Sequence, residues 1–177
     1  MMTNTLYPDD FSSYVIGEEH EPIHARNAVT NTLAVMSMIS QARQNIDLFT
    51  RNLDPSILDN NEITEAIMAF IKISSNSRLR ILLSDPHSAV QHGHRLIEIS
   101  RKFSSFVTIR ETNEEYKSRP CSFMIVDGRA MIYRPHADAY TAMVHFRAEQ
   151  ESRRNAELFN EIWERSEPVS EIRRLFI

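Results

Sequence analysis

The sequence predicts an α/β fold, a mixed β-sheet with helices on both faces. Helical and extended apolar segments alternate over the first two thirds of the chain, which is typical of strands joined by crossover helices. After residue 105 several extended segments follow one another, and Asp127-Gly128 joins two of them in the manner of a tight hairpin. Part of the sheet is therefore predicted to be antiparallel.

The elements follow in order from periodicity and from turn residues. Residues 1–25 show no sustained period and are expected to form an irregular arm. Apolar residues at helical spacing predict helices over 25–43, around 63–70, over 85–103 and over about 149–165, with a short helix after Pro168. Extended apolar runs predict strands at 45–50, 78–84, 106–110, 121–127, 129–134 and 139–146, and residues 51–60 read as a loop.

Composition limits the classes of function. The 177 residues are 42% hydrophobic and 25% charged, which suits one globular domain. A net charge of −4 argues against a nucleic-acid-binding protein that is basic overall. Cys121 is the single cysteine, so a disulfide framework and a cysteine-rich zinc site are excluded. We expect no cofactor, and the absence of a signal-peptide pattern and of a long apolar run predicts a cytoplasmic location.

The hairpin around residues 120–137 carries a recognisable framework. "PCSFMIVDG" resembles the motif of phospholipase D-like proteins, which is H-x-K-x4-D followed by Gly and, after a second strand, by G-S-x-N. Asp127 and Gly128 match this motif. Pro120 stands at the histidine position and Ser122 at the lysine position, and residues 134–137 (RPHA) replace the G-S-x-N block. The framework resembles the family, whereas the reacting residues do not.

The order of elements extends this resemblance over about residues 26–166. "GHRLIEISRKF" and "FNEIWERSEP" are similar to segments of an uncharacterised bacterial family of degenerate phospholipase D-like domains. The resemblance implies an arm at 1–25 followed by a single phospholipase D-like half domain at 26–177. It also implies a homodimer, because half domains of this kind commonly pair across the active-site edge.

The resemblance implies no catalytic residue at the motif. The family's phosphodiester chemistry uses an imidazole nucleophile, a second imidazole as general acid, and Lys and Asn to hold phosphate oxygens. Pro120 has no nucleophile, and Ser122 has no identifiable base. The leading hypothesis is a noncatalytic binding or interaction module.

Charged residues at predicted strand ends and turns form the candidate binding set. Ligands of α/β sheets gather outside the carboxyl ends of the parallel strands. Arginines there would hold a phosphate-bearing or other anionic ligand, small molecule or protein, by bidentate hydrogen bonds. The alternative is a structural network in which the aspartates neutralise the arginines. The candidates are Arg51, Asp85, His94, Arg95, Arg110, Asp127 and Arg134.

Histidines crowd the predicted helix 85–103. His92 and His94 are two residues apart and point to different sides of a regular helix, so we predict no metal site. His94 either pairs with Glu98 on an exposed face or leans with Arg95 over the carboxyl edge of the sheet.

Two alternatives to the binding module stay open. The first is a phosphoesterase with a rebuilt site that uses His94 or His136. The second is a purely structural protein-interaction domain, which predicts an exposed apolar patch that includes Trp163 or the aromatic residues of the arm, Tyr7, Phe11 and Tyr14.

Overall fold

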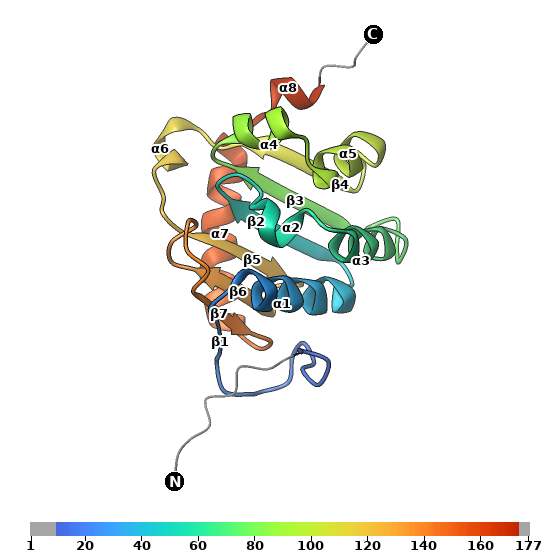
Figure 1. Cartoon of the computed structure of the whole chain (residues 1–177), viewed down its shortest axis with the longest axis vertical. Coiled ribbons are helices and arrows are strands. Elements are labelled where there is room, and N and C mark those ends of the chain that lie inside the picture. The colour runs from blue at the N-terminus through green and yellow to red at the C-terminus, as the bar shows by residue number, and fades with distance from the viewer. Residues whose placement is uncertain (1–9, 174–177) are drawn as a thin grey trace.

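The strands form one sheet in the order β1-β7-β6-β5-β2-β3-β4-β8 in this computed structural model, which describes residues 10–173 (Figure 1). β2, β3 and β4 run parallel to one another, and all other neighbours are antiparallel. The predicted mixed sheet is thus confirmed. The strands are β1 (Ile23–Ala25), β2 (Asn45–Thr50), β3 (Arg78–Leu83), β4 (Val107–Glu111), β5 (Ser122–Val126), β6 (Ala130–Arg134), β7 (Ala142–His145) and β8 (Glu167–Pro168).

Helices cover both faces of the sheet, as predicted. In Figure 1, α1, α3 and α5 lie in front of the sheet and α7 lies behind it. Each face has its own apolar core, because side chains of successive strand residues point to opposite faces. The helices are α1 (Ala28–Gln41), α2 (Pro55–Leu58), α3 (Asn61–Ile71), α4 (Pro86–His92), α5 (Arg95–Lys102), α6 (Glu114–Lys117), α7 (Glu149–Arg165) and α8 (Ser170–Arg173).

The single helix predicted over 85–103 is wrong, because the chain breaks there into α4 and α5. Gly93 has a φ of 73°, a left-handed conformation that glycine adopts without steric cost. His94 then takes extended backbone angles and caps α5 with its side chain. The break moves His94 from a helix face to a helix terminus.

The described part of the arm, residues 10–25, is only partly irregular and packs against the rest of the chain. Ile23–Ala25 form β1, which pairs with β7 at one edge of the sheet. Phe11 is 2% exposed, and Phe11 and Tyr14 both stack on Phe146. Phe11 therefore belongs to the core instead of an exposed apolar patch, and Tyr7 lies outside the described residues.

Besides β1, three short elements were not predicted from the sequence. They are α2 within the predicted loop, α6 after β4, and the two-residue strand β8. Each is four residues or fewer, too short to show a period. Within residues 10–173 no helix combines the length and the apolarity that crossing a membrane requires.

Candidate functional site

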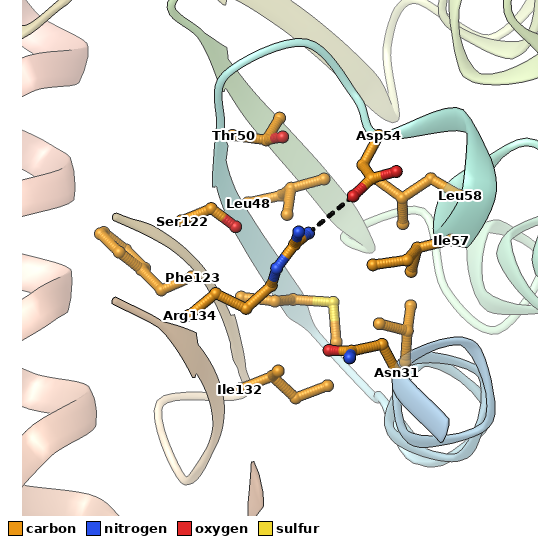
Figure 2. Close-up of a pocket in the computed structure, with 12 residues that line it drawn as sticks. Asn31, Leu48, Thr50, Asp54, Ile57, Leu58, Ser122, Phe123, Ile132 and Arg134 are labelled. Carbon is orange, nitrogen blue, oxygen red and sulfur yellow. Dashed lines mark ion pairs between the residues drawn. The ribbon is translucent and has the colours of Figure 1, made fainter. Parts of the chain in front are cut away.

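Two of the motif positions, Ser122 and Arg134, meet at the edge of the sheet where β2 ends. Phe49 of β2 pairs with Phe123 of β5, so the start of β5 lies beside the end of β2. Ser122 pairs in turn with Arg134, the last residue of β6. Ser122 and Arg134 therefore lie together at the carboxyl edge, near Thr50 (Figure 2). We call this place, lined by Thr50, Asp54, Ser122 and Arg134, the motif pocket.

The Arg134 guanidinium fills the motif pocket. Arg134 is 6% exposed, and its Nη1 lies 3.0 Å from Oδ2 of Asp54. Its Nε donates to the carbonyl oxygen of Ala139 at 2.9 Å, and its Nη2 donates to those of Ala137 and Ala139, both at 2.7 Å. Its guanidinium carbon lies 5.5 Å from the Tyr140 ring centroid. Each nitrogen of the guanidinium thus has a partner, so an incoming anion would have to displace Asp54 or a carbonyl oxygen.

Little space is left beside this ion pair. The cavity that the motif pocket encloses together with Asn31, Leu48 and Ile57 has a volume of about 30 Å³. A single water needs roughly 10–15 Å³ by the same kind of measure, so the space suits one or two waters. It is far below the roughly 300–1,000 Å³ of ordinary small-molecule pockets. The motif pocket is closed to a phosphodiester in this conformation.

Four predicted residues converge on the loop between β2 and α2, residues 51–54. Arg51 begins this loop, and its carbonyl oxygen accepts a hydrogen bond from the Asp85 backbone N–H at 2.7 Å. His94 contacts the carbonyl oxygen of Leu53, and Arg134 contacts Asp54. These residues do converge at the carboxyl edge, as expected. They contact the loop through two hydrogen bonds to its carbonyl oxygens and through one ion pair.

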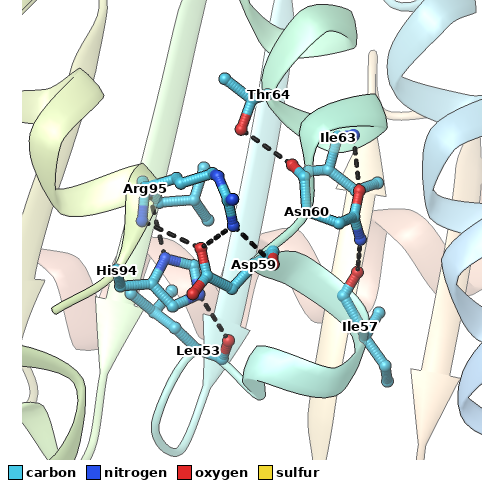
Figure 3. Close-up of polar contacts among 9 residues, drawn as sticks. Leu53, Ile57, Asp59, Asn60, Ile63, Thr64, His94 and Arg95 are labelled. Carbon is cyan, nitrogen blue, oxygen red and sulfur yellow. Dashed lines mark hydrogen bonds and ion pairs between the residues drawn. The ribbon is translucent and has the colours of Figure 1, made fainter. Parts of the chain in front are cut away.

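His94 joins α5 to this loop (Figure 3). Its Nδ1 accepts from the Leu96 backbone N–H at 3.1 Å, and its Nε2 lies 3.0 Å from the carbonyl oxygen of Leu53, which requires Nε2 to carry the proton. His94 is 5% exposed, which makes the predicted exposed pair with Glu98 wrong. Both ring nitrogens are occupied, so His94 is not free to act as a general base.

Burial lowers the pKa of His94 below its ordinary value of 6.5, against the opposing pull of Asp59. A histidine whose pKa is lowered by folding stabilises the fold fully only above its unfolded pKa. We therefore expect the free energy of unfolding to fall as the pH drops below about 6.5. Protonation of Nδ1 would also break its bond to Leu96.

The matched variant for this prediction is His94→Asn, because asparagine is a good helix N-cap and does not titrate. Urea unfolding at pH 7.5 and pH 5.5 should show a smaller loss on acidification for His94→Asn than for the wild type. Equal losses in the two proteins would show that another group, such as His145, whose pKa burial also lowers, carries the pH dependence.

Arg95 is engaged by Asp59, the residue that follows α2. Its backbone N–H and its Nη1 both approach Oδ1 of Asp59, at 3.2 and 3.1 Å, and Nη1 also donates to the Asp59 carbonyl oxygen (Figure 3). Burial raises the pKa of the Asp59 carboxyl, but the Arg95 hydrogen bonds and the nearby His94 outweigh it and leave that pKa lowered. The pair ties the start of α5 to the end of α2.

Asp127 and Arg110 lie away from the motif pocket. Asp127 follows β5, at the opposite end of that strand from Ser122, and its carboxylate accepts the backbone N–H groups of residues 43–45 at 2.7–2.8 Å. Arg110 lies in β4, where it donates to the Ser166 carbonyl oxygen and lies 5.2 Å from the Trp163 ring centroid. The seven candidates therefore do not share one cleft.

Sequence reasoning missed an ion pair between β2 and β3, on the face of the sheet that α7 covers. Arg80 of β3 holds Asp47 of β2 by two hydrogen bonds at 2.7 and 2.9 Å, and its guanidinium carbon lies 4.9 Å from the Phe159 ring centroid. The available signal was one charge inside each of two largely apolar strands, negative in "NIDLFT" and positive at the third position of "RLRILL". Among residues 10–173 no group of three or more His, Cys, Asp or Glu side chains could hold a metal ion.

Solved structures with a similar fold come from the phospholipase D family and from an archaeal DNA-binding protein. TrmBL2, an archaeal chromatin protein, is 18% identical with a TM-score of 0.61; the match covers 86% of this chain but only 56% of that one. Nuc from Salmonella typhimurium, a phospholipase D family member, is 14% identical with a TM-score of 0.59 and is covered over 99% of its length by 84% of this chain. NucT from Helicobacter pylori is 11% identical, with a TM-score of 0.58 and coverages of 85% and 100%.

These likenesses show the phospholipase D-like fold, and at such low identity they show the fold alone. No curated protein matches the chain. A family model described as "Domain of unknown function (DUF7931)" matches residues 27–175, which is most of the sequence. The chain therefore belongs to the DUF7931 family and has a phospholipase D-like α/β fold.

Proposed function

We propose that this chain is a noncatalytic phospholipase D-like module that binds a partner and does not hydrolyse phosphodiesters. The observation that carries the proposal is the motif pocket. Its Arg134 is paired with Asp54 and with two carbonyl oxygens, and the remaining space is about 30 Å³. Catalysis of phosphoryl transfer needs an activated nucleophile and a general acid within reach of the phosphorus and its leaving group. Among the described residues that line this pocket, the Ser122 hydroxyl has no histidine beside it.

The histidines support the same conclusion. Pro120 occupies the position of the nucleophile and contributes a carbonyl oxygen that binds the Ala137 backbone N–H. His94 uses both ring nitrogens in contacts to the backbone. His136 is exposed on the turn after β6 and stands at the variable position of the G-S-x-N block, whose Ser and Asn positions are Pro135 and Ala137. His136 is thus the one group on which the alternative of a rebuilt phosphoesterase site rests.

We expect no hydrolysis of bis(p-nitrophenyl) phosphate above the buffer rate, because no activated nucleophile faces the motif pocket. The measurement is p-nitrophenol release by the wild type, by His136→Ala and by His87→Ala, a matched loss of another exposed histidine. The three should be indistinguishable from buffer. Turnover by the wild type that His136→Ala abolishes and His87→Ala retains would establish the rebuilt site instead.

The partner we propose is anionic. Arg95 and Arg134 are already neutralised by Asp59 and Asp54, so of the four arginines in the candidate set Arg51 and Arg110 remain for an external group. TrmBL2 binds DNA, yet the net charge of −4 on this chain disfavours a duplex as the partner. Binding an acidic protein segment requires less positive charge on this chain than binding a nucleic acid does.

A further inference from the structure

β4 is an incompletely covered edge of the sheet. On one side all five of its residues pair with β3. On the outer side, β8 pairs only with Arg110 and Glu111. Within residues 10–173, Val107–Ile109 therefore have no strand partner on that side, although the Val107 N–H already donates to the Phe103 carbonyl oxygen at 2.9 Å. Such an edge offers its remaining main-chain groups, above all the Ile109 N–H, to an incoming strand.

A groove follows this edge. We call it the β4 groove; its volume is about 640 Å³, and its lining residues come from α5, β4, β8 and α8. Val107, Ile109 and Val169 give it an apolar floor, each of them 6% exposed or less. A volume of this size lies within the range of ordinary binding pockets. The β4 groove is some twenty times larger than the cavity of the motif pocket.

The rim of the β4 groove is positively charged. Arg101, Arg110 and Arg173 line it together with one acid, Glu98, which already binds Arg101 at 2.7 Å. Arg101 is held in place by Glu98 and by the Ile172 carbonyl oxygen, to which its Nε donates at 3.2 Å. The excess of arginine favours a partner that brings carboxylates.

Arg110 also has unused binding capacity. Its Nη2 is fixed by the Ser166 carbonyl oxygen and its guanidinium lies over Trp163, so the side chain is positioned before any partner arrives. Its Nε is buried and has no hydrogen-bond partner in the described part of the chain. A buried donor without a partner is costly, and an added acceptor would relieve that cost.

Building on the proposed function, we propose that the β4 groove binds an extended acidic segment of a partner protein, which adds a strand to the outer edge of β4. Main-chain hydrogen bonds to the uncovered part of β4 would provide affinity. Side chains of a strand alternate, so one set would meet the apolar floor on the face that α5 covers, and carboxylates of the other set would face Arg110 on the face that α7 covers. Arg101 and Arg173 at the rim would attract the negative charge of the segment as a whole. The proposed site thus uses two features of the same groove, the incompletely paired edge of β4 and the positively charged rim.

The test uses a fluorescein-labelled peptide of alternating valine and glutamate, with fluorescence anisotropy at low salt. We expect the wild type to bind this peptide and not one in which lysine replaces glutamate. Arg101→Ala combined with Arg173→Ala should weaken binding by about tenfold or more, since each tenfold step needs only ~1.4 kcal/mol. Arg153→Ala combined with Arg154→Ala, which removes the same charge from the exposed face of α7, should leave binding unchanged.

Hydrogen exchange supplies the second measurement. Binding should slow amide exchange at Ile109, because strand addition would give its outward-facing N–H an acceptor. No binding, equal weakening by both double variants, or binding without slower exchange in β4 would overturn the proposal. So would a DNA duplex that displaces the peptide at equal concentration, or a concentration-dependent dimer that Arg101→Ala with Arg173→Ala dissolves, since these would assign the groove to nucleic acid or to a second copy. Hydrolysis of bis(p-nitrophenyl) phosphate would defeat the proposed function separately, whatever the peptide does.

Discussion

Arg134→Met should lower the free energy of unfolding by about 3–5 kcal/mol, the usual cost of breaking a buried ion pair from one side. The arginine is 6% exposed, and its removal leaves Asp54 without its cation and the Ala137 and Ala139 carbonyl oxygens without donors. Urea unfolding of wild type and variant measures the loss. The same substitution at Arg95 should cost under about 1 kcal/mol, because that pair is far more exposed, with 47% of the Arg95 side chain in solvent.

A double-mutant cycle separates the ion pair from the carbonyl contacts. Asp54→Asn removes the charge of Asp54 and keeps its shape. If the pair is coupled, Arg134→Met with Asp54→Asn should be less destabilised than the sum of the two single losses, because no buried charge is then left alone. Simple additivity would show that Arg134 stabilises the turn after β6 through the two carbonyl oxygens only.

The architecture was predictable from the sequence because its long elements carry strong periods. The strand at 45–50 and the helix at 149–165 match the structure at both ends. The prediction of one helix over 85–103 was wrong because the apolar residues keep a helical period across the break. The only sign of the left-handed turn in the sequence is Gly93 itself. β8 is a strand because it lies beside β4, and no local sequence pattern predicts that tertiary contact.

The site was harder to predict because it depends on partners that are distant in the sequence. Arg134 at the carboxyl edge followed from the motif, but its pairing with Asp54 required the geometry of the loop between β2 and α2. That loop also places Leu53, at a φ of 62°, where its carbonyl oxygen meets His94. Alternation along a strand predicts which face a charge takes, and not which opposite charge lies across from it.

Asp127→Ala is the other substitution for which we expect a large effect, a loss of about 3–4 kcal/mol. Its carboxylate accepts three backbone N–H groups, from residues 43–45, at the start of the central strand β2. Hydrogen bonds to a charged group contribute roughly 1.5–3 kcal/mol each when buried, and less here because these are exposed. Asp127 also has a φ of 51°, a left-handed conformation that disfavours alanine.

Asp127→Asn separates these causes, since asparagine tolerates the left-handed conformation and keeps one acceptor oxygen. We expect it to lose about half as much stability as Asp127→Ala in urea unfolding, with Asp138→Ala, an exposed aspartate, as a control near zero. An alanine variant as stable as the wild type would mean that β2 is positioned without this carboxylate. The expected result separates the motif into two parts: Asp127 joins the hairpin turn to β2 whether or not chemistry occurs, whereas Pro120 and Ser122 stand where the chemistry would be. A chain can therefore lack the reacting residues and still require the aspartate in order to fold.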